Sequence, residues 1–216
     1  LSGCEPTPVS HFGDYPQRLS DWGLLWITGQ RLQAQSESTV YDLNTPLFSD
    51  YAHKYRSVWT PPRQEGAVAT DGALRLPIGS VVTKTFYYSK QDGQLAHTGV
   101  ANGPAAGLDL DMVRLIETRV LLHTEAGWQG LPYIWNEAQT DAMLQITGGV
   151  IPLQVSGLGE FNYVVPDFNQ CQGCHVTNGK LRNRPLACLV VIGPSARVRR
   201  DNRDAIWKVI EHHHVG

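Results

Sequence analysis

The stretch from residue 171 to residue 175 carries the residue types with the clearest chemistry in the chain. It reads Cys171-Gln172-Gly173-Cys174-His175, which is the C-x-x-C-H attachment signature of a c-type haem. Two thiols at this spacing can form thioether bonds to the two vinyl groups of a porphyrin, and the imidazole that follows ligates the iron on its proximal side. We therefore expect one covalent haem c, held by Cys171, Cys174 and His175.

Two other interpretations of the motif stay open. A C-x-x-C pair also forms redox-active or structural disulfides, and Cys188 could complete a zinc site with Cys171, Cys174 and His175. Zinc sites are usually built from two separated pairs of ligands, which this spacing does not provide. Cys188 lies in the apolar run 186–191, where a buried, unreactive thiol is the simpler expectation.

The ligand on the far side of the iron decides between electron transfer and catalysis. A Met or His opposite His175 gives a six-coordinate electron carrier, whereas an open position allows small-molecule binding or peroxide chemistry. The chain has two methionines, Met143 and Met112. Each is a weak candidate, because each precedes a predicted strand and is expected to fill its core or its edge. Three histidines are further candidates that no spacing separates: His53, His97 and His123.

The first four residues predict a lipid anchor. Leu1-Ser2-Gly3-Cys4 matches the end of a bacterial lipoprotein signal, in which the Cys becomes the lipid-bearing N-terminus; a chance tetrapeptide is the alternative. Haem attachment to C-x-x-C-H normally takes place outside the cytoplasm, so both signals indicate export. We expect a periplasmic or cell-surface lipoprotein whose only membrane contact is the lipid on Cys4.

Composition is that of a packed soluble protein. The 216 residues are 42% hydrophobic and 18% charged, which is ordinary for globular domains. The formal net charge of −2 provides no field that would attract nucleic acid. No apolar run approaches the ~20 residues that a membrane-spanning helix requires.

The pattern of β-branched and aromatic residues predicts a mainly β fold. We expect a helical turn near residues 20–21, and short extended pieces and turns over 41–60, with Lys54 and Arg56 at a solvated or salt-bridged edge. A turn at 125–127 should pair two of the strands, and residues 201–214 have helical periodicity. The expected strands are 80–88, 113–123, 131–135, 145–155 and 161–166.

These elements predict one fold class and three segments. The fold class is mainly β, either sandwich-like or made of irregular antiparallel sheets, with a C-terminal α segment around the haem motif. Residues 1–17 form a lipoprotein tether and residues 18–166 the β domain. Residues 167–216 form the haem-attachment segment and C-terminal helix, which pack as one unit with the β domain.

Several longer motifs stand out along the chain: residues 41–52, 77–79, 84–86, 116–119, 133–142, 165–166 and 171–175. Together they resemble a family of exported bacterial proteins. Members of that family carry signal peptides and a single late C-x-x-C-H, and their genes often lie beside genes for parallel β-helix repeat proteins. The resemblance covers roughly residues 18–197 and implies export and a β-helix partner, but it supplies no established reaction.

Three functions are compatible with these observations. The first is an exported monohaem c-type cytochrome-like protein that passes electrons to a redox partner, for which a β-helix repeat protein is one candidate. The second is a haem-dependent oxidoreductase with an open distal site. The third is a non-enzymatic binding or assembly lipoprotein in which the cysteines form a disulfide or zinc staple. No pair of carboxylates has a spacing that indicates acid–base catalysis, so we assign no catalytic residue.

Overall fold

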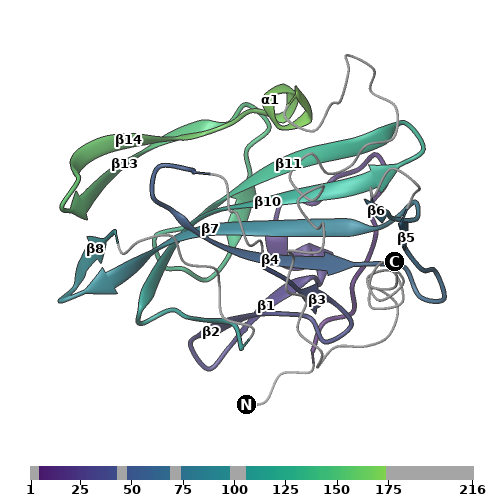
Figure 1. Ribbon diagram of the computed structural model, residues 1–216, viewed down its shortest axis with the longest axis horizontal. Coiled ribbons are helices and arrows are strands. Elements are labelled where there is room, and N and C mark those ends of the chain that lie inside the picture. The colour runs from purple at the N-terminus through teal and green to yellow at the C-terminus, as the bar shows by residue number, and fades with distance from the viewer. Residues whose placement is uncertain (1–4, 43–47, 69–73, 98–105, 174–216) are drawn as a thin grey trace, which may run out of the picture.

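The computed structural model describes residues 5–42, 48–68, 74–97 and 106–173 (Figure 1). These residues form a mainly β protein, as predicted. The elements, in chain order, are η1 (Leu19–Trp22), β1 (Leu25–Thr28), β2 (Arg31–Ala34), β3 (Thr39–Val40), β4 (His53–Trp59), β5 (Ala67–Val68), β6 (Leu74–Arg75), β7 (Val81–Gln91), β8 (Gln94–Ala96), β9 (Leu108–Asp109), β10 (Val113–Thr124), β11 (Gly127–Trp135), β12 (Ala142–Leu144), β13 (Gly149–Ser156), β14 (Gly159–Val165) and α1 (Phe168–Gly173).

Strands β7 and β10 form the centre of the main sheet. They pair antiparallel over most of their length, β10 also pairs with β11, and β11 pairs with the edge strand β12. The predicted turn between β10 and β11 is confirmed, because Thr124 lies opposite Gly127 and only Glu125 and Ala126 connect the strands. Both central strands are rich in β-branched and aromatic residues, which fit a pleated, well-packed surface.

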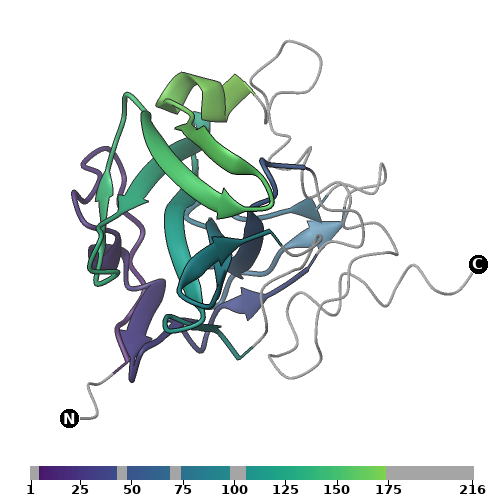
Figure 2. The same cartoon turned by 90° about the vertical axis from the view of Figure 1, so that its left-hand side faces the viewer.

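Strand β8 joins β7 of the main sheet to the hairpin of β13 and β14. The first part of β7 pairs with β4 and its last residues pair with β8. Strand β8 then pairs in parallel with β13 through only two register positions, Val155 with Leu95 and Ser156 with Ala96. As a result, the hairpin of β13 and β14 arches across one side of the sheet, with α1 at its end (Figure 2).

Each face of the central strands has its own hydrophobic core. One face packs Leu122 and Tyr133 against Trp22 and Leu32 of the N-terminal elements. A bulge in β10, between Leu115 and Glu117, inserts Ile116, which belongs to the core on the other face. The members of that second core include Phe86, Tyr88 and Ile116 from the sheet and Leu153, Val155, Tyr163 and Val165 from the hairpin. Burial on this scale contributes roughly 1.5–3 kcal/mol per large apolar side chain.

Part of the segment expected to be a tether packs against the β domain. The Val9 amide donates to the Trp22 carbonyl, and the Leu144 amide donates to the Gln17 carbonyl. The Tyr133 hydroxyl accepts a hydrogen bond from the Trp22 indole at 2.7 Å and donates to the Pro16 carbonyl at 2.8 Å. Residues 9–17 are therefore tied by hydrogen bonds to the same edge of the sheet as β12.

Several predictions for the two ends of the chain fall on residues that the structure does not describe. The lipidation site Cys4 and the helical segment 201–214 lie outside the described residues. In the part of the chain that is described, no helix has the length and apolar character needed to span a membrane.

Buried tyrosines make the fold sensitive to alkaline pH. Burial raises the pKa of Tyr87 and of Tyr133 to about 12, and it also raises the pKa of Tyr55, Tyr88 and Tyr163. A raised folded-state pKa gives stability that is complete below the unfolded value of about 10 and is lost as pH rises through about 12. We expect the free energy of unfolding to fall steeply in this window, as measured by urea unfolding and by the absorbance of tyrosinate.

The substitution Tyr87→Phe tests whether buried tyrosines cause this loss of stability at alkaline pH. It removes one of the raised groups, so the pH dependence should become shallower while the sheet is retained. Tyrosinate absorbance that rises fully near pH 10 with the sheet intact would contradict the expectation.

Candidate functional site

The C-x-x-C-H motif begins on a short helix that is capped at its start. The Gln170 amide donates to Asp167 Oδ1 at 2.8 Å, and the Asp167 amide donates to Gln170 Oε1 at 3.0 Å. This reciprocal pair is a capping box, which satisfies two backbone donors that a helix start leaves without partners. It fixes the position at which α1 begins, three residues before Cys171.

The helix α1 is attached to the edge of the main sheet. The Phe168 amide donates to the Ile146 carbonyl at 3.0 Å, and the Phe168 ring packs against the main core. The helix lies beside β11, next to the turn between β12 and β13 (Figure 1). The backbone of Cys171 belongs to α1, whereas Cys174, His175 and Cys188 lie outside the described residues.

The structure separates the two methionines that were candidates for the distal position. Met143 lies on β12, directly opposite Ile134 of β11, and 42% of its surface is exposed. It therefore lies at the same edge of the sheet as α1. Met112 is 59% exposed and lies in the turn before β10, where its carbonyl accepts a hydrogen bond from the Lys90 amide.

Each of the three candidate histidines contacts an aromatic ring. His53 is buried against Tyr87, and His97 makes an edge contact with Tyr51. His123 stacks on Trp128 with ring centroids 4.7 Å apart, and its Nδ1 lies 3.0 Å from the Pro77 carbonyl oxygen. Among the residues that the structure describes, no group of three or more His, Cys, Asp or Glu side chains could hold a metal ion.

A second polar feature lies on the sheet face that carries Phe86. Arg56, Lys84 and Arg119 stand directly opposite one another on the neighbouring strands β4, β7 and β10. We call these three residues the basic row. Like charges directly opposite each other on adjacent strands destabilise a sheet, by roughly 0.2–1 kcal/mol per pair. The row is therefore an arrangement that packing alone does not explain.

Lys54 and Arg56 were expected at a solvated or salt-bridged edge, and the solvated alternative is wrong. Their exposed fractions are 4% and 2%, and β4 pairs with β7 along its whole length. The pKa of Lys54 is lowered to about 8, mainly by burial and also by the charges of Arg56, Lys84 and Arg119, whereas the charge of Asp50 acts in the opposite direction.

Three of these cations lie close to the Phe86 ring, and one of the three, Arg119, is also bound by Glu117. The Nζ atoms of Lys54 and Lys84 lie 5.9 and 5.0 Å from the centroid of the Phe86 ring, and Arg119 Cζ lies 4.4 Å from it. Glu117 is fully buried and accepts hydrogen bonds from Arg119 Nε at 2.9 Å and from the Tyr163 hydroxyl at 2.6 Å. A buried carboxylate with these partners holds the Arg119 guanidinium in place.

One signal for this group was present in the sequence and was overlooked. Lys54, Arg56 and Lys84 each stand among residues with strong β propensity, at positions where a strand in a packed sheet normally carries apolar side chains. Only the register of the strands shows that the two arginines and Lys84 form a row.

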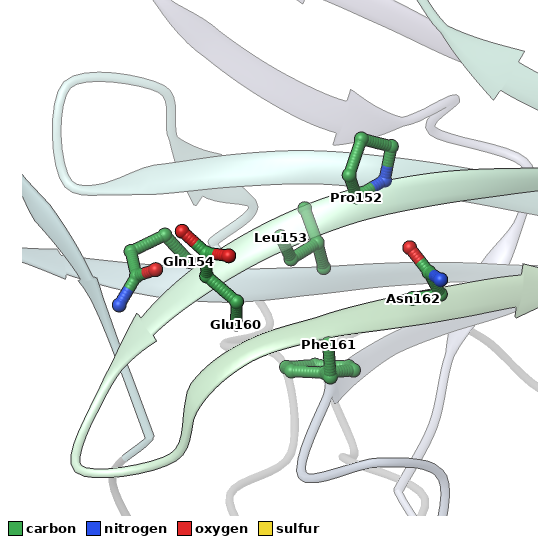
Figure 3. A pocket seen from close by; sticks show the side chains of 6 residues that line it. All are labelled: Pro152, Leu153, Gln154, Glu160, Phe161 and Asn162. Carbon is green, nitrogen blue, oxygen red and sulfur yellow. The ribbon is translucent and has the colours of Figure 1, made fainter.

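A hollow on the hairpin of β13 and β14 shows no grouping of reactive side chains. Its volume is about 500 Å³, and it is lined by Pro152, Leu153, Gln154, Glu160, Phe161 and Asn162. These side chains point to different sides of the two-stranded ribbon (Figure 3). We assign no ligand to it, because specific ligand sites bring a few polar groups together at one point.

Comparison with protein-family models, with curated proteins and with solved structures finds no match for this chain. The site is therefore interpreted from its own residues, and the family resemblance stays an expectation.

The capping box predicts a specific effect on α1. Asp167→Ala removes the side-chain acceptor for the Gln170 amide, and the loss of such a cap costs about 1 kcal/mol. We expect faster hydrogen exchange of the α1 amides and a slightly lower free energy of unfolding. Asn169→Ala is the matched control, because Asn169 is exposed on the same helix. Equal effects of the two substitutions would show that the cap contributes nothing.

Proposed function

We propose that this protein is an exported, lipid-anchored monohaem c-type cytochrome-like protein that transfers electrons in the periplasm or at the cell surface. The observation that carries the proposal is the C-x-x-C-H motif at residues 171–175. A disulfide or a zinc site would use the two thiols but would not need a histidine directly after the second cysteine. The Leu1-Ser2-Gly3-Cys4 sequence supports a lipid anchor on Cys4.

The chemistry of the motif fits a covalently bound haem. Cys171 and Cys174 provide the two thiols for the vinyl groups, and His175 provides the proximal imidazole. When bound, the haem supplies one-electron oxidation and reduction at its iron. The described residues hold the start of the motif in place, through the capping box of Asp167 and Gln170 and the packing of Phe168.

Exposed apolar side chains near α1 support contact with a redox partner. Val150 and Val164 stand opposite each other on β13 and β14 and expose 61% and 59% of their surface. Ile146, whose carbonyl is bound by the Phe168 amide, is 52% exposed. Apolar side chains that gather on a surface favour protein–protein contact, so we propose that a redox partner, such as a β-helix repeat protein, approaches at this edge.

Intact mass tests the proposed haem directly. Protein matured with the cytochrome c assembly machinery should gain the mass of one haem, and its reduced form should show sharp α and β absorption bands. Cys171→Ser and Cys174→Ser should each weaken or abolish attachment, whereas Cys188→Ser should retain the haem. A mass lower by two hydrogens, or bound zinc in place of haem, would instead support a disulfide or zinc staple and overturn the proposal.

The position of Met143 predicts which methionine binds the iron. Met143→Leu in the haem-loaded protein should convert a low-spin ferric spectrum to a high-spin one, because a strong axial ligand is lost. Met112→Leu is the control and should leave the spectrum unchanged. If the unsubstituted protein is already high-spin and responds to cyanide, the distal site is open and the oxidoreductase alternative is favoured.

A further inference from the structure

Strand β14 ends the main sheet and has a neighbouring strand on one side only. The strand order is β12-β11-β10-β7-β8-β13-β14, and Figure 1 shows β14 as the outermost strand beyond β13. Within the described residues, no backbone hydrogen bond reaches β14 from any element other than β13. The opposite edge, β12, is covered by the chain's own N-terminal segment, because Arg18 bridges Met143 and the Leu144 amide donates to the Gln17 carbonyl.

The register of the hairpin shows which backbone groups of β14 face outward. Opposed residues of an antiparallel pair alternate between positions that exchange hydrogen bonds and positions that do not. Asn162 lies opposite Pro152, which has no N–H to donate, so this pair belongs to the second kind. The amides and carbonyls of Asn162 and of the residues two positions away, Glu160 and Val164, therefore point away from β13.

Strand β14 lacks the features that normally protect an exposed edge. Protected edges are very short or bulged, or they carry lysine or proline. Strand β14 pairs with β13 at seven consecutive positions without a bulge. Its seven residues include neither lysine nor proline, and Glu160 is the only charged one. An extended segment can add to such an edge as a further strand.

The chain beyond α1 contains a segment that fits this edge. Residues 186–192 lie outside the described part of the chain and read Leu-Ala-Cys-Leu-Val-Val-Ile, between Pro185 and the pair Gly193-Pro194. A short apolar run that is bounded by turn residues is typical of a buried strand. The segment has seven residues, as β14 has.

Length and position allow this segment to reach the edge. Strand β14 is roughly 24 Å long, whereas the twelve residues 174–185 can span up to about 40 Å. Helix α1 begins three residues after β14 ends, so the chain sets out from the Val165 end of the strand. The shortest connection then brings residues 186–192 back along β14 in the antiparallel direction.

We propose that residues 186–192 pair with the outer edge of β14 as an added antiparallel strand of the main sheet. Residues 174–185, which include His175, are then held at both ends, by α1 and by the added strand. The pairing uses backbone groups, so it extends the apolar surface formed by Val150 and Val164 instead of covering it. The inference does not depend on haem attachment, and its test can be made with or without haem.

Amide hydrogen exchange of the full-length protein, followed by NMR, tests the pairing. The amides of Glu160, Asn162 and Val164 should exchange about a hundredfold or more slowly than in an unstructured chain, because the added strand binds them. The amides of Phe161 and Tyr163 face β13 and serve as internal controls for the hairpin. Rapid exchange at the three outward amides, with slow exchange at the two controls, would show an uncovered edge and overturn the proposal.

Two proline substitutions identify the segment that covers the edge. Successive amides of a strand point to opposite sides, so either Val190→Pro or Val191→Pro removes an N–H that is bonded to β14. That variant should accelerate exchange at the outward amides by about tenfold or more, and the other should have a smaller effect. Val198→Pro lies outside the segment and should change none of these amides.

The remaining outcomes also decide the question. Protection that neither proline affects comes from another occupant and overturns the proposal, and protection that increases with protein concentration identifies a second copy of the chain as that occupant. If a proline variant also loses protection at Phe161 and Tyr163, the hairpin itself has been disrupted. Val190→Gly/Val191→Gly then replaces it, because it keeps both N–H groups and lowers only the strand propensity. It should accelerate the outward amides selectively, and an unchanged pattern would reject the pairing.

Discussion

The burial of both faces of β7 and β10 is the constraint on which the rest of the structure depends. Successive side chains of a strand point to opposite faces, so a strand buried on both sides needs two separate cores. The N-terminal elements supply one of these cores, and the hairpin of β13 and β14 supplies the other. Every charged side chain placed on these strands must then find partners inside the protein, which is why Glu117 is bound by Arg119 and Tyr163.

The same constraint explains how much of the fold could be predicted. Strands at 113–123 and 131–135 and a turn between them follow from local composition, and the structure has strands there, at Val113–Thr124 and the longer Gly127–Trp135. The parallel pairing of β8 with β13 joins segments about sixty residues apart, and no local pattern encodes it. Residues 9–17 were expected in the tether because they are polar and contain proline, yet their backbone groups pair with the sheet.

The candidate site shows the same division between local and non-local information. The motif at residues 171–175 is visible in the sequence because its chemistry lies within five consecutive residues. The basic row draws its members from three strands, so it exists only once the register is known. The solvated alternative for Lys54 and Arg56 failed because the local sequence does not reveal that both side chains are buried where β4 pairs with β7.

The hydrogen bonds of the N-terminal segment also determine the order in which the molecule can fold. The indole of Trp22 is 111 residues from its partner Tyr133, and Ser20 is 121 residues from its partner Asp141. Contacts of such large sequence separation form late, because the chain between them must first be closed into a loop. During synthesis from the N-terminus, residues 9–22 must therefore wait for β11 and β12. Strands β11 and β12, at the edge where α1 packs, therefore pair just before residues 171–175 are synthesised. This edge of the sheet is then already formed when the two cysteines of the motif are added to the chain.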